Sequence, residues 1–135
     1  MTSQPVYLTR RLRFSASHSL NNPTLSKEEN MGLFGNCSNN HGHNFELFIT
    51  LKGEPDPKTG MIINVREIKK IAEQEVIDEF DHNNLNTIQE FKTMLPTTEN
   101  ICIVIWNRLE KHFKGKLYEI KVRETENIEA SFKKQ

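Results

Sequence analysis

The chain is poor in cysteine and has no long hydrophobic run. Its two cysteines, Cys37 and Cys102, lie 65 positions apart, which does not suggest a disulfide framework. No apolar stretch approaches the ~20 residues of a membrane-spanning helix. The first residues also lack the charged and then apolar pattern of a signal peptide. We therefore expect a protein of the reducing cytoplasm that has no membrane association.

An excess of charge of either sign is also missing. Eighteen Lys and Arg residues balance eighteen Asp and Glu residues, so the formal net charge is zero. This balance argues against a broad basic surface for nucleic acid. With 135 residues, 36% of them hydrophobic, the chain is long enough for one apolar core. We expect a single domain over residues 1–135.

Hydrophobic periodicity predicts the order of the secondary structure. Alternation over residues 8–18 and 43–51 indicates two strands, and a long polar connection between them carries at most one helical turn, near residues 25–30. Asn64 and Glu67 resemble a capping box before a helix that runs to Phe80. A second helix begins at Thr97 or Thr98. Two further strands close the chain, over residues 118–124 and 128–132. The order ββααββ predicts an α+β fold, with a four-stranded antiparallel sheet and both helices on one face.

Three histidines stand out as candidate metal ligands. His41 and His43 lie two apart, so on a strand their imidazoles project from the same side. His18 falls on the apolar face of the first strand. Three histidines and an open position are typical of a catalytic zinc site. The alternative is a structural or incidental histidine cluster.

Cys37, four residues before His41, has three interpretations. It is a fourth zinc ligand, an inert side chain, or a thiol made reactive by the nearby Zn²⁺ or by a histidine. Asp81 and His82 supply a partner for the third interpretation, because a carboxylate that orients an imidazole helps to hold a thiolate. On local sequence alone, Asp81-His82 is more typical of a turn that ends a helix.

Glu124 is a carboxylate in phase with the apolar residues of its strand. Burial of an unpaired carboxylate is costly. Either the strand end is exposed, or Glu124 meets a partner such as the N–H edge of a ligand, which a carboxylate can bind with two parallel hydrogen bonds. Thr97, Thr98 and Glu99 are well explained by the chemistry of a helix start alone.

Taken together, these residues resemble the family of the 6-pyruvoyltetrahydropterin and 6-carboxytetrahydropterin synthases. The resemblance covers nearly the whole chain. Its motifs, in order, are Phe14-Ser15-Ala16-Ser17-His18, Leu33-Phe34-Gly35-Asn36-Cys37, His41-Gly42-His43-Asn44, Asp56-Pro57-Lys58-Thr59-Gly60-Met61, Asp81-His82-Asn83-Asn84-Leu85-Asn86, Pro96-Thr97-Thr98-Glu99-Asn100 and Arg123-Glu124-Thr125. Each motif alone is weak, whereas seven in the right order are very specific.

The resemblance implies a tunnelling fold (T-fold) that assembles as a homohexamer, a dimer of trimers with sites between subunits. By position, the zinc ligands are His18, His41 and His43. The catalytic cysteine is Cys37, with Asp81 and His82 of a neighbouring subunit as its partners. The resemblance assigns the pterin-anchoring carboxylate to Glu124, and Thr98 with Glu99 to the lining of that pocket.

The activity that the resemblance implies is a zinc-dependent lyase reaction on 7,8-dihydroneopterin triphosphate, with release of triphosphate. The product is a 6-pyruvoyl or a 6-carboxy tetrahydropterin. The segments before Cys37 and around Met61 look more like the pyruvoyl branch, whereas the three-residue spacer between Cys37 and His41 equals that of the carboxy branch. Two other classes remain: a non-catalytic, zinc-stabilised module that binds pterin or purine, and a structural zinc protein with four protein ligands.

Overall fold

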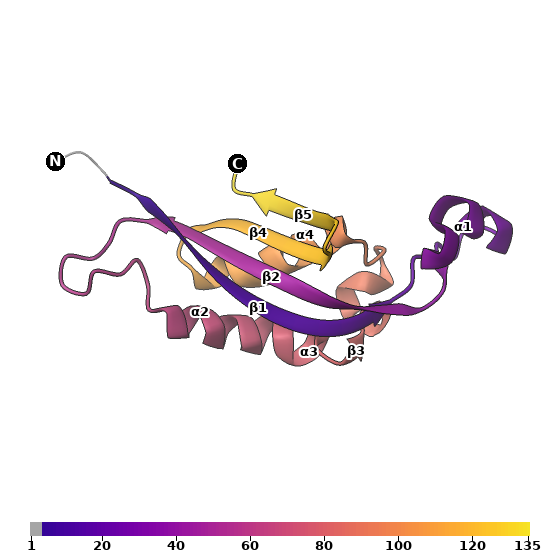
Figure 1. Ribbon diagram of the computed structural model, residues 1–135, viewed down its shortest axis with the longest axis horizontal. Helices are drawn as coiled ribbons and strands as arrows, with labels where there is room; N and C mark the ends of the chain where they lie inside the picture. The colour runs from indigo at the N-terminus through magenta and orange to yellow at the C-terminus, as the bar shows by residue number, and fades with distance from the viewer. Residues whose placement is uncertain (1–3) are drawn as a thin grey trace.

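The computed structural model describes residues 4–135, and Figure 1 shows the course of the chain. The strands are β1 (Val6–His18), β2 (His41–Gly53), β3 (Asn83–Asn84), β4 (Leu117–Thr125) and β5 (Ile128–Lys133). The α-helices are α1 (Lys27–Phe34), α2 (Val65–Ala72), α3 (Asp78–Phe80) and α4 (Thr98–Leu109). A π-helical turn, Glu73–Ile77, joins α2 to α3, and short 3₁₀ turns lie at Gly35–Ser38, Leu85–Thr87, Gln89–Lys92 and Glu110–His112.

The sheet has the strand order β3-β1-β2-β4-β5. Its four long strands are antiparallel neighbours, as the alternation predicts. The prediction of only four strands was wrong, because the two residues of β3 pair in parallel with Ala16 and Ser17 of β1. Two adjacent asparagines carry no alternation of apolar residues, so nothing in their side chains indicates a strand.

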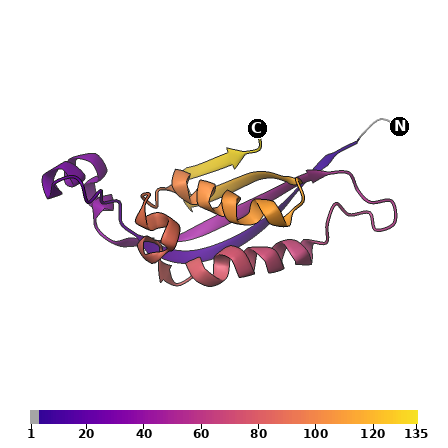
Figure 2. The ribbon, with the colours of Figure 1, turned by 180° about the vertical axis from the view of Figure 1, so that it is seen from behind.

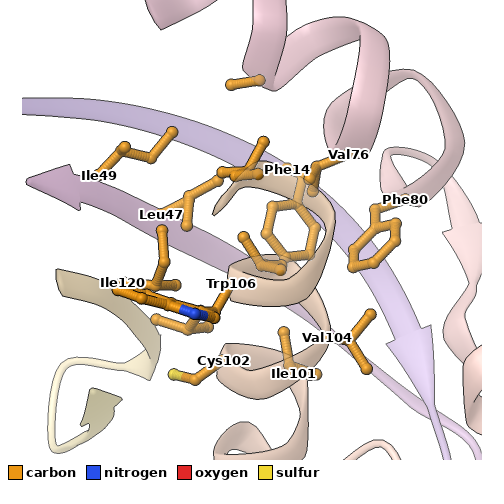
Figure 3. Close-up of a cluster of buried hydrophobic side chains, with 14 of the residues drawn as sticks. Phe14, Leu47, Ile49, Val76, Phe80, Ile101, Cys102, Val104, Trp106 and Ile120 are labelled. Atoms are coloured by element: carbon orange, nitrogen blue, oxygen red, sulfur yellow. The ribbon is translucent and has the colours of Figure 1, made fainter. Parts of the chain in front are cut away.

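Both helical stretches cover the same face of the sheet, as predicted (Figure 2). One is the stretch from α2 to α3, interrupted by the π-helical turn, and the other is α4. Between them and the sheet lies one apolar core, part of which Figure 3 shows. Phe14 of β1 stacks on Phe45 of β2 with ring centroids 4.9 Å apart, and Phe80 meets Phe14 edge-on at 5.6 Å. These rings anchor the end of the sheet to which His18 belongs.

Helix α1 is longer than the single turn expected in the polar connection. Ser26 caps it: the Ser26 hydroxyl accepts from the Glu29 amide, and the Glu29 carboxylate accepts from the Ser26 amide, both at 3.0 Å. The capping box is therefore here and not at Asn64, whose side chain caps α2 without a reciprocal bond from Glu67. The helix escaped prediction because it lacks an apolar stripe, and Leu33 is 67% exposed. It stands away from the rest of the molecule at one end (Figure 1).

The connection from β2 to α2 contains no strand over residues 61–63, and residues 62–63 form bends. Among residues 4–135, no helix combines the length and the apolar character that crossing a membrane requires.

Candidate metal centre and its surroundings

The three histidines meet where β1 ends and β2 begins. In the antiparallel register, His18 is directly opposite His41, and Ala16 is opposite His43. Because alternate residues of a strand share a face, all three imidazoles lie on the side that the helices cover. The ligand atoms of the three side chains lie within 4.8 Å of one another. The predicted grouping of these residues is therefore present in the fold.

Backbone carbonyls determine the tautomer of His18 and His41, and so which ring nitrogen of each is available to a metal. Nδ1 of His18 lies 2.7 Å from the carbonyl oxygen of Pro96, and Nδ1 of His41 lies 2.8 Å from that of Asn39. A carbonyl oxygen only accepts hydrogen bonds, so each Nδ1 must carry the proton. In the neutral ring, Nε2 then presents a lone pair. This is the arrangement in which protein histidines bind metals, with the second nitrogen held by an outer partner.

Two ring nitrogens of the histidine cluster lack hydrogen-bond partners within residues 4–135. His18 is fully buried, and the Nε2 atoms of His18 and His43 are buried without a hydrogen bond among the described residues. Burial lowers the pKa of both His18 and His43, which favours the neutral, metal-binding form. Buried polar atoms normally have partners. The donor set and its orphaned atoms therefore fit a zinc ion.

Glu124 lies against the same two histidines. Its Oε1 is 3.3 Å from Nε2 of His18 and 3.5 Å from Nε2 of His43, and the Glu124 side chain is 15% exposed. Of the two outcomes expected for this carboxylate, the structure therefore favours a partner over an exposed strand end. A carboxylate oxygen that faces two lone pairs is repelled unless a cation or a proton lies between them. This arrangement supplies a second reason why the site suits a positive ion.

Cys37 lies outside the histidine group. It belongs to the 3₁₀ turn that follows α1, its side chain is exposed, and its carbonyl oxygen accepts a 2.8 Å hydrogen bond from the Leu20 amide. The turn begins at Gly35, whose φ of 57° and ψ of −135° strongly favour glycine. Among residues 4–135, the group of converging ligand atoms consists of those of His18, His41 and His43, so the geometry does not support Cys37 as a fourth ligand.

Asp81 and His82 form a pair at the edge of the sheet. Asp81 Oδ1 accepts from the Ser15 amide at 2.8 Å and lies 3.3 Å from Nδ1 of His82. The His82 side chain is 77% exposed. Over residues 4–135, no hydrogen bond joins either residue to Cys37. A single chain therefore assembles the carboxylate–imidazole pair but does not connect it to the thiol.

A shallow hollow of about 480 Å³ brings His82 and His43 to one surface. It is lined by Ser15, Ala16, Ser17, Gly42, His43, Asn44, His82, Asn83 and Asn84. These residues come from the end of β1, the beginning of β2, the turn before β3 and β3 itself. The fold therefore places one residue of the metal centre, His43, and one residue of the Asp81–His82 pair, His82, beside a common hollow.

Thr98 and Glu99 begin α4. Thr97 is the N-cap, with its hydroxyl 3.2 Å from the Asn100 amide, while Thr98 is buried and Glu99 is exposed. In the described part of the chain, neither Thr98 nor Glu99 forms a side-chain hydrogen bond or ion pair with the histidines or Glu124. Pro96, immediately before this helix, is a site residue that the pattern of side chains missed, because it acts through its carbonyl oxygen.

Fold and site together define an α+β protein with an open, three-histidine candidate metal centre. Comparison with known proteins identifies its family: the model described as 6-pyruvoyl tetrahydropterin synthase matches residues 7–135. The 6-pyruvoyl tetrahydrobiopterin synthase of Dictyostelium discoideum is 46% identical over 126 residues, which are 93% of each chain. The Homo sapiens protein of that name is 44% identical over 124 residues, 89% of this chain and 86% of the human one.

A solved structure supports the same assignment. The 6-pyruvoyl tetrahydropterin synthase of Caenorhabditis elegans matches with a TM-score of 0.93 at 34% identity, over 100% of both chains. The chain belongs to the 6-pyruvoyl tetrahydropterin synthase family, whose members are pterin synthase enzymes. The expected T-fold is thereby confirmed, with the short strand β3 added to the predicted sheet.

Proposed function

We propose that this protein is a zinc-dependent lyase that converts 7,8-dihydroneopterin triphosphate into 6-pyruvoyl tetrahydropterin and triphosphate. The observation that carries the proposal is the convergence of His18, His41 and His43, with two Nδ1 atoms held by carbonyls and the buried Nε2 atoms of His18 and His43 without partners. The names of the relatives at 46% and 44% identity favour the pyruvoyl product over the carboxy product.

Zinc would be held by the three histidines. When bound, the ion supplies a Lewis acid that polarises the side-chain hydroxyls of the substrate and acidifies the neighbouring C–H and O–H bonds. Three protein ligands would leave a coordination position for the substrate, as catalytic zinc sites do. The Nδ1 contacts of His18 and His41 would keep both rings in the ligating tautomer.

The proton transfers are assigned to Cys37, Asp81 and His82. The Cys37 thiolate would remove a proton from a carbon of the substrate side chain, and the resulting thiol would return a proton to the ring carbon that carries this side chain, which becomes saturated in the tetrahydropterin. The imidazole of His82, oriented by Asp81, would restore the thiolate between transfers. Loss of triphosphate and reduction of the dihydropterin ring are balanced by oxidation of the side chain, so the reaction needs no external oxidant.

Recognition of the pterin ring is assigned to Glu124. As an anion it would accept two hydrogen bonds from the 2-amino group and the adjacent ring N–H. Its low exposure would strengthen these bonds relative to bonds formed in water. Thr98 and Glu99, in the first turn of α4, would line the same pocket.

The complete site is proposed to form between subunits of a homohexamer built as a dimer of trimers. The separation of Cys37 from Asp81 and His82 within one chain supports this assembly, because a second copy is then needed to bring the pair to the thiol. The sheet also ends in β5 on one side, and such an edge strand offers unpaired backbone groups to a neighbour. We propose a cytoplasmic location for the assembled enzyme.

Incubation with 7,8-dihydroneopterin triphosphate and zinc, followed by mass spectrometry, tests this function. We expect triphosphate and a tetrahydropterin with a pyruvoyl side chain. A 6-carboxy product with acetaldehyde would place the chain on the other branch. If pterin binds in a Glu124-dependent manner without turnover under any condition, the protein is a non-catalytic binding module and the proposal is wrong.

A further inference from the structure

Arg108, in the last turn of α4, makes a concentrated set of polar contacts outside the metal centre. Its Nε and Nη2 donate to the two carboxylate oxygens of Glu90, both at 2.7 Å. Its Nη1 lies 2.6 Å from Oε1 of Glu79 and donates to the carbonyl oxygen of Glu75 at 2.8 Å. The Arg108 side chain is only 18% exposed. Charge-assisted, bidentate contacts of this kind are strong and geometrically specific.

These contacts converge on the segment that leads into Asp81. Glu75 lies in the π-helical turn Glu73–Ile77, and Glu79 lies in α3. The guanidinium group also lies over the ring of Phe80, 5.1 Å from its centroid. A π-helical turn changes the phase of a helix and often occurs near functional sites. Arg108 therefore fixes the turn that sets the direction in which the chain leaves α3.

The Asp81–His82 pair is held on its other side by one residue of β1. The Ser15 amide donates to Asp81 Oδ1 at 2.8 Å, and the Ser15 carbonyl accepts from the His82 amide at 2.6 Å. The φ of His82 is 57°, an unfavourable conformation for a residue with a side chain. Such a conformation persists only where surrounding contacts enforce it. Ser15 supplies the contacts on the strand side, and on the helix side the Asp81 amide donates to the carbonyl of Ile77, the last residue of the π-helical turn, at 2.9 Å.

We infer that Arg108 is a positioning residue for the Asp81–His82 pair. Arg108 joins Glu90 to the π-helical turn and to α3, and these contacts hold the end of α3 beside Ser15. The imidazole of His82 is thereby kept in its outward, active orientation. This inference rests on the proposed function, in which His82 transfers protons. Loss of Arg108 leaves the histidine cluster and Glu124 in place, because none of their contacts involves it.

The test replaces Arg108 with glutamine and with lysine. Hydrogen exchange, measured by mass spectrometry without substrate, reports on the amides of Asp81 and His82, which are bonded to Ile77 and Ser15. We expect Arg108→Gln to speed exchange over residues 77–84 about tenfold. We also expect kcat to fall on the order of 10- to 100-fold, as misplacement of a catalytic group does, with KM and zinc content unchanged. Arg108→Lys, which keeps the charge but not the bidentate fork, should fall between.

Cys102→Ala is the matched control. Cys102 lies on the same helix, is buried, and donates to the Ala130 carbonyl at 3.1 Å, away from α3. It should lower the unfolding temperature without changing exchange over residues 77–84 or kcat. The inference is overturned if the Arg108 variants exchange there like the wild type, or if their kcat falls no further than that of the control. Should Arg108→Gln fail to fold, Arg108→Lys decides by the same two measurements.

The failure of this inference differs from the failure of the proposed function. A wild-type protein that does not turn over dihydroneopterin triphosphate contradicts the function. Hydrogen exchange over residues 77–84 is measured without substrate. If the wild-type protein does not turn over, hydrogen exchange alone decides whether Arg108 positions the Asp81–His82 pair.

Discussion

Replacing Cys37 with alanine should separate proton transfer from metal binding. In the proposed mechanism the thiol moves protons, whereas zinc is held by three histidines whose ligand atoms lie within 4.8 Å of one another. Cys37→Ala should therefore lower turnover strongly and leave one zinc per chain. His41→Ala, which removes a ligand, should lower both zinc content and turnover.

The structure sets the size of each effect. The Cys37 side chain is exposed and makes no hydrogen bond among the described residues, and the contact from the Leu20 amide reaches the Cys37 carbonyl, which alanine retains. The free energy of unfolding should therefore change by no more than about 0.5 kcal/mol. Removal of a group that transfers protons typically lowers the rate about 100- to 10,000-fold. We expect kcat to fall within that range.

The assay combines three measurements on each variant: zinc content by atomic emission, unfolding temperature, and release of triphosphate from dihydroneopterin triphosphate. The decisive result is the zinc content of Cys37→Ala. If this variant loses its metal, Cys37 is a fourth ligand, the centre is closed, and the lyase mechanism is wrong. Unchanged kcat with zinc retained would refute the catalytic assignment alone.

Three further predictions concern the same end of the molecule. Glu124→Gln, which keeps the shape and removes the charge, should weaken pterin binding by about 1.5–3 kcal/mol in a fluorescence titration; unchanged affinity would exclude Glu124 as the anchor. Chelation of zinc should lower the unfolding temperature, and added zinc should restore it. At a free zinc concentration 100 times Kd, the expected gain in the free energy of unfolding is about 2.7 kcal/mol. An unfolding temperature that does not respond to zinc would argue against a bound metal. Gly35→Ala should lower the free energy of unfolding by about 1–3 kcal/mol, because the φ of Gly35 is 57°. Gly32→Ala, inside α1 with open space around it, should raise the free energy of unfolding slightly. Equal effects of the two substitutions in calorimetry would contradict this expectation.

Side-chain periodicity predicted the elements that have one apolar face. β1, β2, β4 and β5, together with the two helical stretches, bury alternate or helically spaced residues, so burial itself leaves a pattern in the sequence. The π-helical turn Glu73–Ile77 is not visible in the pattern of apolar residues, because Val76 within the turn is buried like Ala72 before it and Phe80 after it. β3 and α1 owe their formation to backbone pairing and to the cap at Ser26. Neither requires an apolar pattern.

The candidate site was predictable to the extent that it consists of side chains. His18, His41 and His43 are recognisable from their spacing and strand phase, and Glu124 from a charge at an apolar position. The contacts that orient these side chains come from the backbone, so the sequence does not reveal them. Two are carbonyl oxygens, of Pro96 and Asn39, and every residue type has one. Only the folded backbone identifies them. The contacts of Arg108 with Glu75, Glu79 and Glu90 escaped prediction because they join segments far apart in the sequence.

The short spacer between Cys37 and His41 acquires a physical meaning in the folded chain. Asn39 ends the 3₁₀ turn of Cys37, with its amide bonded to the Asn36 carbonyl at 3.1 Å, and its own carbonyl accepts from Nδ1 of His41 at 2.8 Å. One residue therefore links the turn that carries the thiol to the tautomer of a zinc ligand. A longer spacer would remove this direct link. The three-residue spacing, which by itself resembles the carboxy branch, therefore also has a role in orienting His41 that does not depend on the product.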